Sequence, residues 1–190
     1  MKSVIFFDVD TQYDFMHKDG KFYVKNAEDI IPNLNAITQF ALTNSIPVFA
    51  SIDNNGFGNA TGKWDKLKIP ETRLGNSIIV PNKKLANEII RQLKKENKLL
   101  IEKQEHNAFS NPNLKPILKG TKKAYVYGVA TDYCVKEAVL ELRNMKIETY
   151  IIKDAIKSVL KKNEKRDLAL FRDKGAKFLT TSQLLRKKEL

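Results

Sequence analysis

The chain has 190 residues, 42% of them hydrophobic, which is enough to bury the core of one domain, and we expect residues 1–190 to form a single domain. The single cysteine excludes an intrachain disulfide, and no apolar stretch approaches the roughly 18 residues of a membrane span, so we expect a cytoplasmic protein with no membrane partner. The net charge of +12 comes from lysines spread along the chain, which favours a solvated basic surface over nucleic-acid binding.

Strand-like and helix-like segments alternate along the whole chain. Apolar runs predict six strands, at 3–10, 47–52, 99–102, 124–127, 148–153 and 176–179. Helical periodicity predicts helices over 27–43, 82–97, 112–119, from about 131 onward, 162–174 and 182–188. Residues 53–81 form a long stretch without a regular pattern. This alternation predicts a Rossmann-like α/β fold, a three-layer α/β/α arrangement whose six-stranded, mostly parallel sheet has helices on both faces.

Three chemically reactive side chains follow the ends of predicted strands. Asp10 ends the first strand, Lys103 ends the third, and Cys134 follows the fourth. Because ligands bind at the carboxyl ends of parallel strands, we expect these residues to converge as base, orienting cation and nucleophile. Cys134 would lie in the first turn of a helix, whose positive end should lower the thiol pKa from about 8.5. The alternative is that Cys134 is a small buried hydrophobic residue.

Three motifs carry a resemblance to a known family. Phe7–Phe15 resembles the opening motif of the isochorismatase-like cysteine hydrolases, in which a strand ends in Asp-x-Gln-x-Asp-Phe. Lys103–Phe109 is similar to the family's lysine motif, and Gly128–Val135 is similar to its nucleophile motif in the form found in nicotinamidases and related amidases. The motifs occur in the family's order. Counting back from Gln12 in the first motif places Asp10, rather than Asp8, at the catalytic position.

The resemblance implies a mechanism that passes through a thioester. Asp10 would take the thiol proton, Cys134 would attack an amide carbonyl, and water activated by Asp10 would then release the acid, with Lys103 orienting the pair. The backbone amides of Ala130 and Cys134 would form the oxyanion hole, and the family implies a cis peptide between Val129 and Ala130. The family also implies self-association, so we expect a homo-oligomer.

The chain departs from the metal site that nicotinamidases of this family carry. Their Asp-x-His unit reads Asp53-Asn54-Asn55 here, and aligning Trp64 with the family's pocket tryptophan puts Leu67 at another histidine ligand position. Transition metals prefer imidazole to amides, so we expect no metal cofactor, although a divalent ion such as zinc is the alternative. Asp53 is then a structural or substrate-side polar group.

Aromatic residues are expected to line the substrate pocket. The resemblance and their positions in the motifs assign this role to Phe15, Trp64, His106, Phe109 and Tyr133, and such walls suit a small planar amide. His106 stands where the family often has tyrosine, and it either lines the pocket or packs at its rim. Ordinary core packing is the alternative for each of these aromatic residues.

The sequence therefore predicts a cysteine hydrolase that cleaves a C–N bond of a small amide. Nicotinamide is the first substrate to consider, because the nucleophile motif resembles that of nicotinamidases. Other amides or carbamoyl compounds are the runner-up substrates. Two alternative functions that do not involve catalysis stay open. One is a family member that has lost its activity and serves as a binding protein, and the other is a nucleic-acid-binding α/β domain, suggested only by the net charge.

Overall fold

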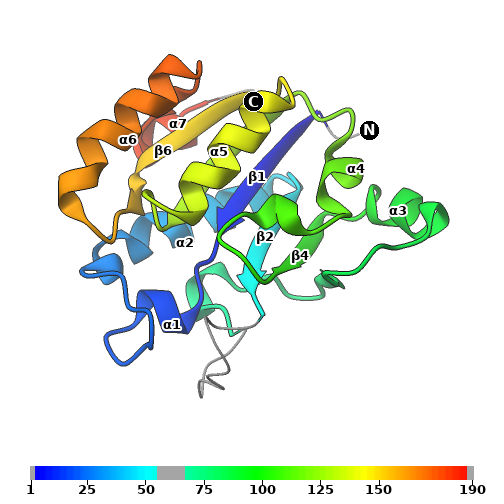
Figure 1. Cartoon of the computed structure of the whole chain (residues 1–190), viewed down its shortest axis with the longest axis horizontal. Coiled ribbons are helices and arrows are strands. Elements are labelled where there is room, and N and C mark those ends of the chain that lie inside the picture. The colour runs from blue at the N-terminus through cyan, green and yellow to red at the C-terminus, as the bar shows by residue number, and fades with distance from the viewer. Residues whose placement is uncertain (1–2, 55–66, 188–190) are drawn as a thin grey trace.

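The computed structural model describes residues 3–54 and 67–187, and its centre is one sheet in which every strand pairs in parallel with its neighbours (Figure 1). The spatial order of the strands is β3-β4-β2-β1-β5-β6-β7. Their bounds are β1 Val4–Val9, β2 Val48–Asp53, β3 Ile78–Val80, β4 Lys98–Lys103, β5 Lys123–Val129, β6 Glu148–Lys157 and β7 Lys177–Leu179. The predicted parallel sheet is confirmed, with the first strand of the chain at its centre.

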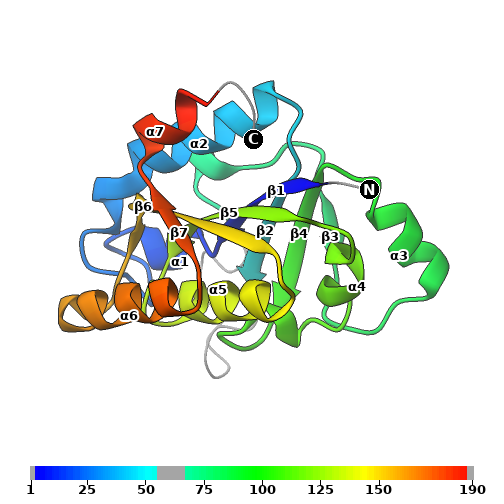
Figure 2. The same ribbon diagram turned by 90° about the horizontal axis from the view of Figure 1, so that it is seen from above.

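Helices cover both faces of the sheet (Figure 2). The α-helices are α1 Tyr13–Met16, α2 Ile31–Thr43, α3 Asn87–Leu93, α4 Leu114–Leu118, α5 Cys134–Asn144, α6 Lys161–Asp173 and α7 Thr181–Leu185. Short 3₁₀ helices occupy Ala27–Ile30, Pro70–Thr72 and Ala108–Ser110. Helices α2 and α7 pack on one face, and α3 to α6 contribute to the core on the other. In the part of the chain that the structure describes, no helix is long and apolar enough to cross a membrane.

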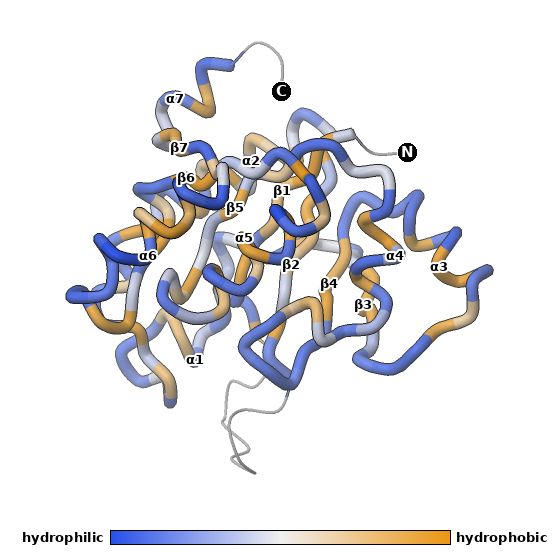
Figure 3. The backbone as a smooth tube through the Cα atoms, turned by 45° about the horizontal axis from the view of Figure 1, so that its top comes forward, coloured by the Kyte–Doolittle hydropathy of each residue, from blue (hydrophilic) through white to orange (hydrophobic). Residues whose placement is uncertain are grey.

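Each face of the sheet has its own hydrophobic core, because successive side chains of a strand point to opposite faces. In β1, Ile5 and Phe7 join the core under α5, whereas Phe6 joins the core under α2. Apolar residues consequently follow the strands through the interior, and hydrophilic residues gather in the connecting loops (Figure 3). Burial on both faces explains why these strands read as continuous apolar runs rather than as alternating ones.

The sheet has seven strands rather than the predicted six. Strand β3 lies within the stretch that the sequence pattern left irregular, and it pairs with β4 through Ile78, Ile79 and Val80. Strand β3 has only three residues, and of these Ile78 and Ile79 are exposed at the edge of the sheet. A segment this short does not show the hydrophobic pattern from which a strand is predicted. The predicted helix at 82–97 is also shorter, since α3 begins only at Asn87.

The strand register brings the ends of four central strands together. Val9 pairs with Ser51 of β2 and with Gly128 of β5, and Asp53 of β2 pairs with Lys103 of β4. Asp10 follows Val9 directly, and Cys134 follows the end of β5 after one turn. The three residues expected to converge therefore meet at the carboxyl edge of the sheet, as the rule for parallel α/β sheets requires.

Gly128 allows β1 and β5 to approach closely just before this edge. Its φ of +115° lies where side chains are rarely tolerated, and a Cβ built there would lie 2.1 Å from the Val9 carbonyl oxygen. The β5–β6 register also shifts between Val126 and Gly128. A residue without a side chain is therefore needed at this position, immediately beside Asp10.

We predict that Gly128→Ala destabilises the fold by about 3 kcal/mol, from the positive φ together with the backbone overlap. Gly75→Ala is the matched control, because a Cβ at Gly75 would meet nothing within 4 Å. Urea unfolding followed by circular dichroism gives both values. Equal midpoints for the two variants would contradict the assignment of this role to Gly128.

Candidate active site

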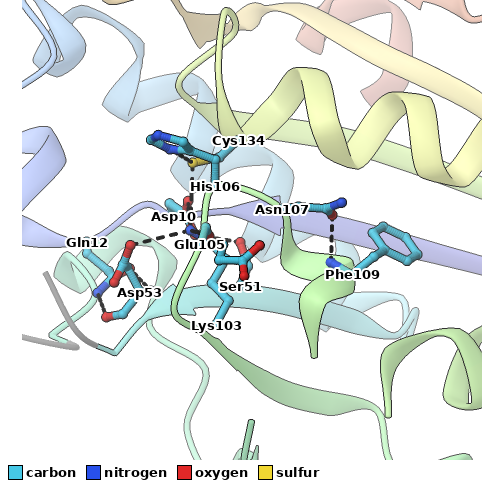
Figure 4. A network of polar contacts seen from close by, with 10 residues as sticks. All are labelled: Asp10, Gln12, Ser51, Asp53, Lys103, Glu105, His106, Asn107, Phe109 and Cys134. Carbon is cyan, nitrogen blue, oxygen red and sulfur yellow. Dashed lines mark hydrogen bonds and ion pairs between the residues drawn. The ribbon is translucent and has the colours of Figure 1, made fainter. Parts of the chain in front are cut away.

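Lys103 is the centre of a buried charged cluster at the carboxyl edge of the sheet (Figure 4). Its side chain is 0% exposed, and its Nζ lies 2.9 Å from Asp10 Oδ2, 3.6 Å from Asp53 Oδ2 and 3.7 Å from Cys134 Sγ. Burial by itself lowers the pKa of Lys103, but the charges of Asp10, Cys134 and Asp53 outweigh it and raise that pKa above its ordinary value. The ammonium group therefore stays charged and holds three acidic groups around it.

Asp10 is fixed between two hydrogen-bonding partners. Ser51 Oγ donates to its Oδ1 at 2.6 Å, and Lys103 Nζ contacts its Oδ2. The backbone of Asp10 has a φ of +49°, in the left-handed region that aspartate tolerates better than most residues. This turn at the end of β1 aims the carboxylate at the neighbouring strands, and Asp10 also lines the cavity described below.

Cys134 is the first residue of α5 and is buried, with 6% of its surface exposed. The helix begins here rather than near residue 131, because residues 131–133 form a turn. The expected lowering of the thiol pKa is wrong: burial, followed by the negative charge of Asp10, raises the pKa of Cys134 well above its ordinary value, and Lys103 offsets this only in part. The sulfur therefore carries a proton at rest, and a nearby base is needed to activate it.

The turn between β5 and α5 carries the two residues that were expected to form the oxyanion hole, Ala130 and Cys134. The peptide bond between Val129 and Ala130 is cis. The amides of Thr131, Tyr133 and Val135 donate to backbone carbonyls, that of Thr131 to Lys157 and the other two to Ala130. Ala130 and Cys134, whose amides the resemblance assigns to the oxyanion hole, both line the cavity.

A cavity of about 490 Å³ opens over Cys134. Of the residues expected to line it, Phe15, His106 and Tyr133 do so, and the His106 and Tyr133 rings lie 5.1 Å apart between centroids. The pattern in the sequence missed further lining residues from the segment after α1 and from the end of β6, namely Lys21, Phe22, Tyr23, Val24 and Val159. The walls are mostly apolar, and the polar groups gather around the sulfur.

Two expected wall residues are not part of this cavity. Phe109 is buried in the core beneath α5, where its ring lies 6.3 Å from that of Phe7, so its expected place in the pocket is wrong. The amide of Phe109 donates to Asn107 Oδ1 at 2.8 Å in a short helical turn, which directs the ring inward. Trp64 lies outside the described residues.

A comparison with protein families matches residues 4–183 to the isochorismatase domain family. The chain belongs to the isochorismatase family. The match confirms the family resemblance that the three motifs indicated. Members of this family are hydrolases, and they include amidases. A search of the curated proteins found no match.

Solved structures with the isochorismatase fold superpose on nearly the whole chain. An isochorismatase-like hydrolase from Alkaliphilus metalliredigens has a TM-score of 0.75 at 18% identity and covers 100% of both chains. N-carbamoylsarcosine amidase from Thermoplasma acidophilum has a TM-score of 0.73 at 18% identity, covering 100% of this chain and 99% of its own. The pyrazinamidase of Pyrococcus horikoshii, solved in complex with zinc, has a TM-score of 0.69 at 25% identity, covering 94% and 99%.

Among the residues that the structure describes, Asp53 lies beside a cation and its backbone is held by Gln12. Its carboxylate faces the Lys103 ammonium, and its backbone is clamped by Gln12, whose amide side chain both accepts from Asp53 N–H at 2.7 Å and donates to Asp53 O at 3.1 Å. Among residues 3–54 and 67–187, no group of three or more histidine, cysteine or acidic side chains could hold a metal. Leu67, at an expected ligand position, is exposed, and Asn55 lies outside the described residues.

A second buried ion pair in this isochorismatase-family chain explains Asp8, for which the sequence suggested no role. Lys68 Nζ lies 2.9 Å from Asp8 Oδ2, and both side chains are almost fully buried. Thr11 Oγ1 donates to Asp8 Oδ1 at 2.8 Å and also contacts Thr72 Oγ1 at 2.7 Å. Burial raises the pKa of Asp8, and Lys68 opposes that shift. This network joins the segment that begins at residue 67 to the end of β1, close to Asp10.

The sequence analysis did not predict a role for Ser51 or Lys68, and only Ser51 stands out in the sequence. Ser51 stands as a polar residue between the apolar residues Ala50 and Ile52 of β2, and that contrast could have marked it. Lys68 follows a long irregular stretch, where one lysine among many gives no sign that it becomes buried.

We predict that Lys68→Met destabilises the protein by about 3–5 kcal/mol, because it leaves Asp8 buried without its cation. Combining Lys68→Met with Asp8→Asn should restore much of the loss, since neither charge is then buried. Urea unfolding of both single variants and the double variant measures this coupling. Lys177→Met, which breaks an exposed ion pair with Glu148, should leave the unfolding midpoint nearly unchanged. Additive effects of the two buried substitutions would contradict the pairing.

Proposed function

We propose that this protein is a metal-independent cysteine amidase that cleaves the C–N bond of a small amide. The observation that carries the proposal is that Asp10 and Cys134 line one cavity and share a buried cation behind it, since Lys103 Nζ lies within 3.7 Å of both a carboxylate oxygen of Asp10 and the sulfur. A carboxylate base, a fixed cation and a thiol are sufficient for nucleophilic acyl transfer.

In the acylation step, Asp10 takes the proton of the Cys134 thiol; the two groups are held near each other by Lys103 Nζ, which contacts both. The sulfur then attacks the amide carbonyl, so that an S–C bond forms. Collapse of the tetrahedral intermediate breaks the C–N bond, and the proton held by Asp10 passes to the leaving nitrogen, which departs as ammonia or an amine. Lys103 stabilises the thiolate while the proton is away.

The oxyanion of the intermediate would be held by the backbone amides of Ala130 and Cys134. Both residues line the cavity at the turn before α5, where the positive end of the helix dipole also favours negative charge. Hydrolysis of the thioester by water then frees Cys134 and yields the acid, which balances the overall reaction of amide and water to acid and amine.

The shape and chemistry of the cavity favour a small, flat amide. Phe15 and Phe22 stack at 6.0 Å on one side of the cavity, and Tyr133 and His106 pack together beside the sulfur. Nicotinamide is the first substrate that we propose, and amidases acting on nicotinamide and carbamoyl compounds occur among the structures that share the fold. Other small amides and carbamoyl compounds are the alternatives.

A binding protein without catalysis is the competing function. The complete set of Asp10, Lys103 and Cys134 argues against it, because a buried lysine ringed by acidic groups is costly to keep where no chemistry requires it. Binding of a small amide in this cavity without any Cys134-dependent release of ammonia would favour the binding protein.

We predict that the wild-type protein releases ammonia from at least one member of a panel containing nicotinamide, pyrazinamide and N-carbamoylglycine. Cys134→Ala should abolish this release, because it removes the nucleophile. Asp10→Asn should lower it by at least about 10²-fold, since the thiol then has no base. A coupled ammonia assay measures all three proteins. Full activity of Cys134→Ala would refute the mechanism.

We predict that removal of divalent metal leaves this activity unchanged, because the Asp53 carboxylate contacts the Lys103 ammonium, and no group of three or more histidine, cysteine or acidic side chains among the described residues could hold a metal. The measurement compares ammonia release before and after dialysis against a chelator, with residual zinc determined by atomic emission. A loss that added zinc restores would show that a metal takes part.

A further inference from the structure

His106 contacts the reactive sulfur, although the mechanism above assigns it no step. Its Nδ1 lies 3.8 Å from Cys134 Sγ, and the ring borders the cavity. In Figure 4 the imidazole lies next to the sulfur, whereas Asp10 and Lys103 lie below it. The sulfur is thus placed between a buried acid–base group and an imidazole at the solvent-facing rim.

The imidazole is held in place from two sides. Lys103 Nζ donates to the Glu105 carbonyl at 3.0 Å, which fixes the loop that carries His106 to the same ammonium group that orients Asp10. The His106 ring also packs against Tyr133, with 38° between the ring planes. Lys103 therefore fixes the loop that carries His106, and Tyr133 fixes the ring itself, so the imidazole is well placed to act at the sulfur.

Asp10 and His106 differ in their access to water. Asp10 is 1% exposed, and its two oxygens already contact Ser51 and Lys103. His106 is exposed, so water that enters the cavity after ammonia has left meets the imidazole first. Imidazole is also the side chain whose ordinary titration lies between pH 5 and 8, where proton exchange with water is most effective.

We propose that His106 is a further catalytic residue of this site, which acts in hydrolysis of the thioester; the inference rests on the proposed amidase function. His106 in its neutral form takes a proton from water as the water oxygen attacks the thioester carbon and a C–O bond forms. The C–S bond then breaks, and the imidazolium returns that proton to Cys134 Sγ, 3.8 Å away. The thiol and the neutral imidazole are both restored.

Several ionisable groups lie around the His106 ring. The loop of His106 and α5 together border a second hollow beside the ring, which brings Glu105 and Glu137 near it. They include Cys134 and Glu137 on α5, Tyr133 directly before α5, Glu105 on the same loop, and Asp10 and Lys103 behind the sulfur.

The first test needs no substrate. Cys134 is the only cysteine, so alkylation by iodoacetamide, followed by intact-protein mass, reports on this sulfur alone. We expect the alkylation rate of the wild type to show an inflection between pH 5 and 8 that His106→Gln removes. His17→Gln, which changes the only other histidine, an exposed residue after α1, should keep it. An unchanged inflection in His106→Gln would overturn the proposal.

The second test uses whichever panel amide releases ammonia with the wild type. We expect His106→Gln to lower kcat about 10²-fold with little change in KM, and to accumulate a covalent acyl group on Cys134 in acid-quenched samples. A raised KM with normal kcat and no acyl-enzyme would mean that His106 only binds substrate, and would overturn the proposal. No ammonia from any amide would count against the proposed function instead, and the alkylation profile would still decide whether His106 and Cys134 exchange protons.

Discussion

The site depends on one ammonium group that has been removed from water. An isolated buried charge costs several kcal/mol, so Lys103 can occupy its position only if negative partners surround it. Asp10 and Asp53 supply these partners from two other segments of the chain, and the sulfur of Cys134 lies beside the same ammonium group. The same contacts that make the buried lysine tolerable also bring together the carboxylate and the thiol that the proposed mechanism uses as base and nucleophile.

The sheet order decides which residues can meet around that charge. Strand β1 lies between β2 and β5, so the end of β1 is flanked by Ser51 on one side and by the turn that leads to Cys134 on the other. Gly128 permits close contact with the Val9 carbonyl just before this point, and the left-handed backbone of Asp10 then turns the carboxylate toward its partners. Parallel strands are required, because only they end at the same edge.

Burial acts on the Cys134 thiol in a way that suits the proposed acyl transfer. The thiol of Cys134 keeps its proton because the cavity floor disfavours the thiolate, although the sulfur lies at a helix N-terminus. A site of this kind activates its nucleophile only when a base and a substrate are both in place. Asp8, two residues before Asp10, is a separate buried carboxylate that pairs with Lys68. Lys103 is therefore free to pair with Asp10 beside Cys134.

The sequence by itself determined the fold class, the order of the motifs and the positions of Asp10, Lys103 and Cys134 at strand ends, because hydrophobic periodicity and strand boundaries are local properties of the chain. Only the tertiary structure decided that β3 completes the sheet, that Phe109 belongs to the core, that Lys68 pairs with Asp8 and that the thiol pKa rises. These features depend on which distant segments come into contact and on how much water they exclude, and neither is encoded within a short stretch of residues.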